Sequence, residues 1–282
     1  MAKMTPRTLS GFMELLPPAQ QQMERIMEIL RKTYSLYGFT PLDTPAIEAA
    51  EVLLAKGGGE TEKQIYRFTK GDSDLALRFD LTVPLAKYVA LHQNELTFPF
   101  RRFQISKVYR GERAQKGRYR EFYQADIDVI GDGSLNITNE AEIPSIIYKT
   151  FTALGLRRFK IRANNRKVLN GLFAILGLEK QAGDVMRTID KLEKIGLDNV
   201  KAELLERGLG QEAVDKLQPI LELSGDNSQK LTKLREVLAV SETGLKGIEE
   251  METVFGYVQR SGIGLTVELD LSLARGLNYY TG

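Results

Sequence analysis

The chain has 282 residues, with 39 lysines and arginines against 37 aspartates and glutamates, a single histidine and no cysteine. The absence of cysteine excludes disulfides, thiolate nucleophiles and cysteine-ligated metal centres, and a lone histidine, His92, excludes a site built from several histidines. The longest uncharged run, Val168 to Leu178, is too short to span a bilayer. Because the first residues also lack the apolar core of a signal peptide, we expect a cytoplasmic protein with no membrane partner.

The first part of the chain predicts helices and a hairpin. After Pro17 and Pro18, apolar residues at helical spacing predict an amphipathic helix that ends at Gly38. Prolines then predict an extended segment over residues 39–46. The following patterns predict a short helix over 47–56, a mobile glycine loop at 57–59, a hairpin over 64–79 with its turn at 71–73, and a helix over 82–94.

The remainder of the chain predicts two further strands and then a long helical stretch. Residues 100–110 and 120–131 are two long strands, followed by a helix over 138–154 and strands over 157–163 and 265–271. Everything between the last two strands is helix-like and rich in lysine and glutamate. We therefore expect a first domain at 1–163, a helical insertion at 164–262, and a return to the first domain at 263–282.

A cluster of basic residues is hidden by the net charge of +2. Eight cations against one anion, Glu112, lie between Arg101 and Arg120. A cluster of this kind attracts polyanions such as nucleotide phosphates or a nucleic-acid backbone. Strand alternation puts Arg110 and Glu112 on one face, and the returning strand puts four side chains on one face: Phe122, Gln124, Asp126 and Asp128. The two sets line one pocket if the strands pair, and the alternative is a solvated hairpin with its charges in water.

Two other segments carry weaker signals. Asp80 and Thr82 point the same way on an extended segment. For this segment taken alone, the favoured explanation is Thr82 as a helix cap and Asp80 as a first-turn acid. The C-terminal LARGLNYYTG contains Arg275 before two tyrosines. Its alternative interpretation is an edge strand with core tyrosines.

Three segments in this order resemble one enzyme family. LRFDLTVPLAKY, YRGERAQKGRYREFYQADIDVIG and LARGLNYYTG are similar to the histidine-specific signatures of histidyl-tRNA synthetases, which are class II aminoacyl-tRNA synthetases. The resemblance implies an α+β fold, with an antiparallel sheet flanked by helices and an inserted all-helical domain. It also implies ATP with Mg²⁺, L-histidine and tRNA(His) as partners, and a homodimer formed through a stretch ending near Pro45.

The resemblance also implies a role for each matching residue. Arg110 and Arg275 match the catalytic arginines at the α-phosphate of ATP, and both also match histidine-binding positions. The other implied histidine-binding residues are Asp80, Leu81, Thr82, Gln124, Asp128, Tyr279 and Tyr280. The other implied ATP-binding residues are Glu112, Arg118 and Arg120. No metal ligand is assigned.

Some implications of the resemblance remain open. The family's last signature has aspartate where this chain has Asn278, and we expect activity to survive that change. The chain ends before the family's third motif and anticodon-binding domain, so we expect an impaired catalytic fragment. The alternatives are a non-aminoacylating regulatory paralogue of ATP phosphoribosyltransferase in histidine biosynthesis, and a related ligase or binding domain of other specificity. The presence of Arg110, Glu112 and Arg275 favours the synthetase.

Overall fold

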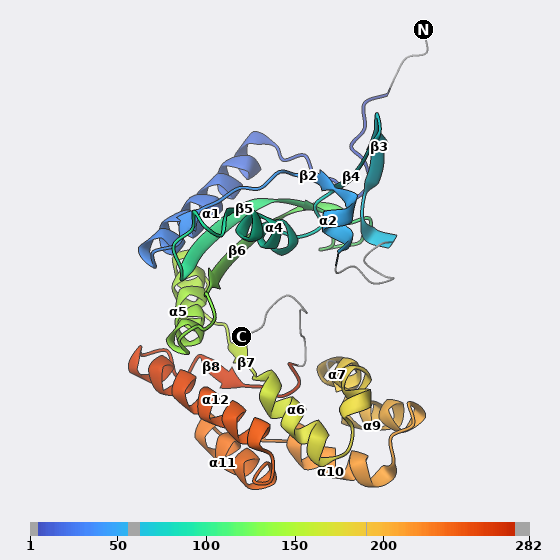
Figure 1. Ribbon diagram of the computed structural model, residues 1–282, viewed down its shortest axis with the longest axis vertical. Helices are drawn as coiled ribbons and strands as arrows, with labels where there is room; N and C mark the ends of the chain where they lie inside the picture. The colour runs from blue at the N-terminus through green and yellow to red at the C-terminus, as the bar shows by residue number, and fades with distance from the viewer. Residues whose placement is uncertain (1–4, 56–62, 190, 274–282) are drawn as a thin grey trace. The chain divides into compact units, whose positions relative to one another are not determined.

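The computed structural model describes residues 5–55, 63–189 and 191–273, and these residues form two compact units (Figure 1). The first unit comprises the described residues up to Leu135, and the second comprises those from Asn136 onward. Both units combine helices with short sheets, so the predicted α+β class is confirmed. The predicted domain boundaries at 163 and 262 remain a prediction.

The first unit contains two three-stranded sheets. In one, β1 (Thr40–Pro41) pairs parallel with β5 (Phe100–Tyr109), which pairs antiparallel with β6 (Glu121–Ile130). In the other, β4 (Ser73–Leu77) lies between β2 (Ile47–Ala49) and β3 (Arg67–Lys70), both antiparallel to it. The sequence predicted both hairpins, and the structure confirms them.

Helix α1 (Pro17–Leu36) begins at the prolines that marked its start and packs against β1 and β5. Its buried face includes Tyr34, whose ring centroid lies 5.7 Å from that of Phe103 on β5. Gly38 follows the helix with φ 76°, a conformation that glycine adopts without steric cost. The predicted helix and its glycine stop are therefore confirmed.

The helix predicted over residues 47–56 is wrong at its start. Residues Ile47–Ala49 form strand β2, in which Ile47 lies opposite Leu77, and only α2 (Ala50–Leu54) is helical. Pairing with β4 overrides the local helical pattern because the strand gains a hydrogen-bonded partner that no local signal reveals. The predicted glycine loop at 57–59 lies outside the described residues.

A buried polar network fixes the segment just before helix α4 (Thr82–His92). Arg78 is buried, and its Nε donates to the Lys107 carbonyl at 2.8 Å. The Tyr109 amide donates to the Arg78 carbonyl at 2.9 Å. At the other end of this side chain, Arg78 Nη1 lies 3.3 Å from Asp43 Oδ1. These bonds hold residues 78–80 against the end of β5.

The second unit is built mainly of helices around one apolar core. Helix α5 (Thr138–Ala153) and the parallel pair β7 (Ile161–Ala163) and β8 (Val267–Leu269) accompany the helical stretch. The helices between the two strands are α6 (Arg166–Ile175), α7 (Ala182–Ile189), α8 (Leu192–Ile195), α9 (Leu197–Glu206), α10 (Gln211–Leu221), α11 (Asn227–Val237) and α12 (Glu242–Arg260), with a 3₁₀ turn at Glu179–Gln181. No strand interrupts the described residues between β7 and β8, as predicted.

Glycines allow helices α6 and α12 to approach each other closely in that core. A Cβ on Gly171 of α6 would lie 2.6 Å from the Gly244 Cα of α12, and a Cβ on Gly247 would lie 2.8 Å from the Val168 amide nitrogen. Only residues without a side chain permit so close an approach of α6 and α12. Fully buried Phe173 and Ile248 fill the core beside this crossing.

Candidate active site

The β5–β6 ladder determines which polar side chains share a face. Its register sets Ser106 opposite Gln124, Gln104 opposite Asp126, and Arg102 opposite Asp128. The predicted common face of β6 is therefore present, and β5 adds polar residues that the sequence did not assign to the site. Gln124 Oε1 is buried and accepts no hydrogen bond within the described part of the chain, so it is an acceptor available to a ligand.

Arg102 is the most deeply buried cation on this face. Its side chain is 0% exposed, and its Nη2 lies 2.6 Å from Asp128 Oδ2, a carboxylate that is itself 4% exposed. Nη2 also lies 3.4 Å from the Leu81 carbonyl. One guanidinium therefore joins the sheet to the start of α4. Arg102 belongs to the basic cluster between Arg101 and Arg120, but no local pattern predicts its burial or its role.

Asp126 lies between other carboxylates on the same face. Burial raises its pKa to about 6; the charge of Arg102 opposes this, while Asp128 and Asp80 reinforce it. Gln124 Nε2 donates to Asp126 Oδ1 at 3.4 Å. Three carboxylates and one guanidinium give this region an excess of negative charge, which favours a cationic ligand.

Asp80, rather than Thr82, caps helix α4. Asp80 is buried, and its Oδ1 accepts a hydrogen bond from the Val83 amide at 3.1 Å. Thr82 is the first residue of the helix, so it does not occupy the cap position that the alternative interpretation gave it. The predicted first-turn role of Asp80 becomes a capping role, since its carboxylate satisfies an amide that has no partner inside the helix.

Strand β5 ends at Tyr109, so Arg110 and Glu112 do not share a strand face as predicted. They begin the hairpin loop, residues 110–120. Arg110 Nε nevertheless donates to the Phe79 carbonyl at 3.0 Å, and its guanidinium carbon lies 5.1 Å from the centroid of the Phe122 ring. Arg110 therefore lies between residues 79–80 and the polar face of β6.

The hairpin loop has a defined conformation. The Arg110 amide donates to the Arg120 carbonyl at 2.8 Å, and Gln115 and Arg118 exchange backbone hydrogen bonds of 3.2 and 2.9 Å at its tip. Arg118 Nη1 lies 3.6 Å from Glu112 Oε2, with the Arg118 side chain 68% exposed. Arg113 and Lys116 are exposed as well. The cations at the tip face solvent, where a polyanion can reach them.

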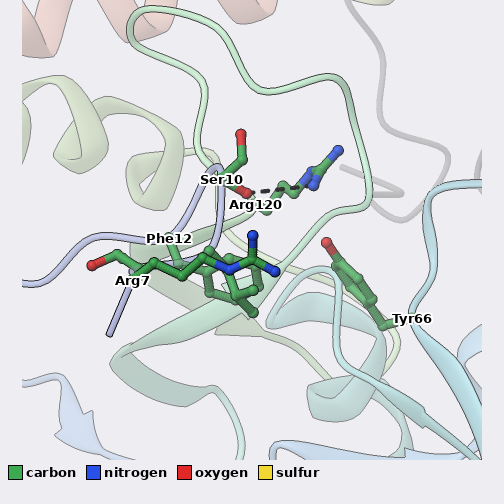
Figure 2. A pocket seen from close by; sticks show the side chains of 7 residues that line it. Arg7, Ser10, Phe12, Tyr66 and Arg120 are labelled. Carbon is green, nitrogen blue, oxygen red and sulfur yellow. Dashed lines mark hydrogen bonds between the residues drawn. The ribbon is translucent and has the colours of Figure 1, made fainter. Parts of the chain in front are cut away.

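The N-terminal strap, residues 7–12, lies against the second end of this loop. The Arg120 amide donates to the Gly11 carbonyl at 2.7 Å, and Arg120 Nη1 lies 3.4 Å from the Ser10 carbonyl. This second bond, dashed in Figure 2, lies beside a cavity lined by strap residues, Tyr66 and Arg120. The volume of the cavity is about 560 Å³. No local pattern of residues indicates that residues 7–12 approach the loop.

Some residues of the predicted site have no described position in the structure. The predicted residues Arg275, Tyr279 and Tyr280, together with Asn278, lie outside the described residues. Within residues 5–55, 63–189 and 191–273, no group of three or more His, Asp or Glu side chains could hold a metal ion. No helix among these residues is long and apolar enough to cross a membrane.

Comparison with known proteins identifies the family. A family model described as histidyl-tRNA synthetase matches residues 11–282. The chain belongs to the histidyl-tRNA synthetase family. The resemblance of the three signature segments to histidyl-tRNA synthetases is therefore confirmed.

Individual members of the histidyl-tRNA synthetase family agree in sequence and fold. The histidine–tRNA ligase of Clostridium tetani is 54% identical over 98% of this chain, and the match covers 63% of that protein. The crystal structure of histidyl-tRNA synthetase from Nostoc sp. PCC 7120 superposes with a TM-score of 0.90 at 42% identity, covering 99% of this chain and 64% of that one. The chain thus spans just under two thirds of the length of these relatives.

A more distant structure shares the fold. It is described as an ATP phosphoribosyltransferase regulatory subunit/histidyl-tRNA synthetase from Bacillus halodurans. It superposes with a TM-score of 0.84 at 24% identity, covering 99% of this chain and 72% of that one. At that identity the likeness concerns the fold alone, so the activity has to be argued from the site.

Proposed function

We propose that this chain is the catalytic portion of a histidine–tRNA ligase. Such an enzyme activates L-histidine with ATP to histidyl-adenylate and then transfers histidine to the 3′ end of tRNA(His). The observation that carries the proposal is the position of Arg110, which contacts the Phe79 carbonyl and the Phe122 ring at once. It thereby joins the residues expected to bind histidine to the loop expected to bind ATP.

The first step is a displacement at phosphorus. A carboxylate oxygen of histidine attacks the α-phosphorus of ATP, the bond to the bridging oxygen of the β-phosphate breaks, and pyrophosphate leaves. Negative charge spreads over the α-phosphate oxygens, so fixed cations contribute more than proton transfer does. Arg110 and Arg275 are proposed to supply them, and ATP enters as its Mg²⁺ complex. Glu112, Arg118 and Arg120 are proposed to bind the rest of the nucleotide.

Histidine recognition is proposed for the polar face of β6 and the start of α4. Asp80, Leu81 and Thr82 would hold the α-amino group with the help of Gln124, whose buried Oε1 is an available acceptor. Asp128, together with Tyr279 and Tyr280, would read the imidazole nitrogens. A buried polar site of this kind rejects an amino acid that leaves its groups unpaired.

The remaining partners follow from the family. We propose that the helical insertion, residues 164–262, contacts the acceptor arm of tRNA(His), and that the catalytic parts are residues 1–163 and 263–282. We also propose a cytoplasmic homodimer.

The homodimer is expected to form through the stretch that ends near Pro45. Hydrogen bonds around Asp43 support an ordered conformation of this stretch, because Asp43 Oδ1 accepts from Gln104 Nε2 at 2.7 Å and from Ser106 Oγ at 2.9 Å.

Histidine-dependent exchange of pyrophosphate into ATP tests the proposal on the full-length protein. We expect exchange with L-histidine and none with other amino acids. Arg110→Ala should abolish it, whereas His92→Gln, at the end of α4 and beside Glu95, should not. A protein that binds histidine but supports no exchange would instead be the regulatory paralogue. Exchange with a different amino acid would indicate a ligase of other specificity.

A further inference from the structure

The N-terminal strap contacts a loop that lies more than a hundred residues away in the sequence. Its central link is the Gly11 carbonyl, which accepts hydrogen bonds from the amides of Arg120 at 2.7 Å and Glu121 at 3.3 Å. These two amides belong to the last residue of the hairpin loop and the first residue of β6. The strap therefore binds the loop through the main chain at the point where the loop rejoins the sheet.

The side chains of residues 8–10 contribute little packing to this contact, whereas Phe12 is partly buried. Leu9, the largest apolar side chain in the exposed part of the strap, is 63% exposed, and Thr8 and Ser10 are exposed too. The cavity of about 560 Å³ lined by the strap, Tyr66 and Arg120 is open space that side chains do not fill (Figure 2). The hydrogen bonds at Ser10 and Gly11, together with Phe12, therefore hold the strap in place.

Gly11 meets two requirements that other residues do not. Its φ of 84° lies in the left-handed region, which side chains with a Cβ rarely adopt. A Cβ at this position would also lie 2.8 Å from Arg120 Cγ and 3.1 Å from Ala114 Cβ. Both neighbours belong to the hairpin loop, so a larger residue forces the Arg120 side chain, the loop or the strap to shift.

The contact continues from Arg120 to residues expected to bind ATP. Arg120 Nε donates to the Glu112 carbonyl at 3.0 Å, and the Arg120 carbonyl accepts from the Arg110 amide at 2.8 Å. A shift of Arg120 therefore disturbs its hydrogen bonds to the backbone of Arg110 and Glu112. Displacement of a binding group by about an ångström is enough to weaken a bound transition state strongly.

We infer that Gly11 is a positioning residue, which holds the hairpin loop in the conformation that receives the nucleotide. The inference rests on the proposed function for its kinetic consequence and on the described contacts for its structural one. It assigns to the N-terminal strap a part in ATP binding that acts through Arg120 and the hairpin loop.

Gly11→Ala is the direct test, and Gly38→Ala is its matched control. Gly38 has a φ of 76°, close to that of Gly11, but a Cβ there would meet nothing within 4 Å. Both variants therefore place alanine at a similar positive φ, and only Gly11→Ala presses on the loop. In pyrophosphate exchange we expect Gly11→Ala to raise the KM for ATP roughly tenfold, while the KM for histidine changes less than about twofold. Gly38→Ala should change neither.

Two further measurements keep the test decisive. Gly11→Asn places a Cβ beside Arg120 in a residue that tolerates positive φ, so it should raise the KM for ATP as alanine does. Amide hydrogen exchange of Arg120 and Glu121 in the unliganded protein should become faster in Gly11→Ala and stay unchanged in Gly38→Ala. A KM for ATP in Gly11→Ala or Gly11→Asn equal to that of Gly38→Ala overturns the inference, as does unchanged amide exchange.

The two proposals fail in different ways. If the wild-type protein shows no histidine-dependent pyrophosphate exchange, the proposed ligase function is wrong. Amide exchange at Arg120 and Glu121 then still decides whether Gly11 holds the loop, because that measurement requires no activity.

Discussion

Arg102 and Asp128 face each other across the β5–β6 ladder, with Arg102 Nη2 2.6 Å from Asp128 Oδ2. Both side chains are buried, and the same nitrogen of Arg102 approaches the Leu81 carbonyl. The pair therefore ties the strand that carries Asp128 to the segment that carries Asp80. Residues from two elements of the proposed histidine site share one buried cation.

Removing the buried cation of Arg102 should destabilise the folded chain. Arg102→Met leaves Asp128 buried without its counter-charge, so we expect the free energy of unfolding to fall by about 3–5 kcal/mol. Urea denaturation measures the change. Arg67→Met is the control, since Arg67 pairs with Asp74 across β3 and β4 with both side chains about half exposed. Equal destabilisation by the two substitutions would contradict a special role for the buried pair.

Asp126 should make stability depend on pH. Burial raises the pKa of Asp126 from its ordinary 3.8 to about 6, so the folded chain retains this proton where the unfolded chain has lost it. Its contribution to the free energy of unfolding is therefore largest below about pH 4 and is lost as the pH rises to about 6. After allowance for solvent screening at a half-buried position, Asp126→Asn should raise the free energy of unfolding by about 1–2 kcal/mol at pH 7.

The measurement is urea denaturation of wild type and Asp126→Asn at several values between pH 4 and 7. The exposed turn residue Asp72 supplies the control, Asp72→Asn, which should retain the wild-type pH dependence. Parallel stability curves for wild type and Asp126→Asn across this range would exclude Asp126 as the titrating group.

Asp80 should combine a capping role with a binding role, and two substitutions separate them. Asp80→Asn keeps an oxygen for the Val83 amide, whereas Asp80→Ala removes the cap and should cost about 1 kcal/mol of stability. Both remove the charge proposed to hold the α-amino group, so both should raise the KM for histidine by more than about tenfold. Thermal unfolding and exchange kinetics together check this. If the KM of Asp80→Asn for histidine equals that of the wild type, Asp80 has a structural role only.

Arg118 should matter for the nucleotide and not for folding. Its contact with Glu112 is 3.6 Å long and its side chain is 68% exposed, so Arg118→Ala should change the free energy of unfolding by less than about 0.5 kcal/mol. The KM for ATP should rise several-fold, because a cation near the phosphates is lost. Lys180→Ala, at an exposed position of the second unit, is the control. An unchanged KM for ATP would remove Arg118 from the proposed site.

The elements that sequence patterns predicted best are those defined by neighbours in the chain. The start of α1 at Pro17 follows from the fixed φ of proline, and its end follows from Gly38. The β5–β6 hairpin follows from two long strands around a glycine-containing loop, and its register then determines which residues share the face of Asp128. The family resemblance of three ordered segments was likewise carried by the sequence alone.

Contacts between distant residues required the tertiary structure. No local pattern shows that Ile47 pairs with Leu77, that Arg102 is buried beside Asp128, or that Gly11 reaches Arg120. The capping role of Asp80 was also decided by the fold, because the helix begins at Thr82 rather than after it. Propensity and periodicity act over a few residues, whereas burial, charge pairing and close approach depend on which distant segments the folded chain brings together.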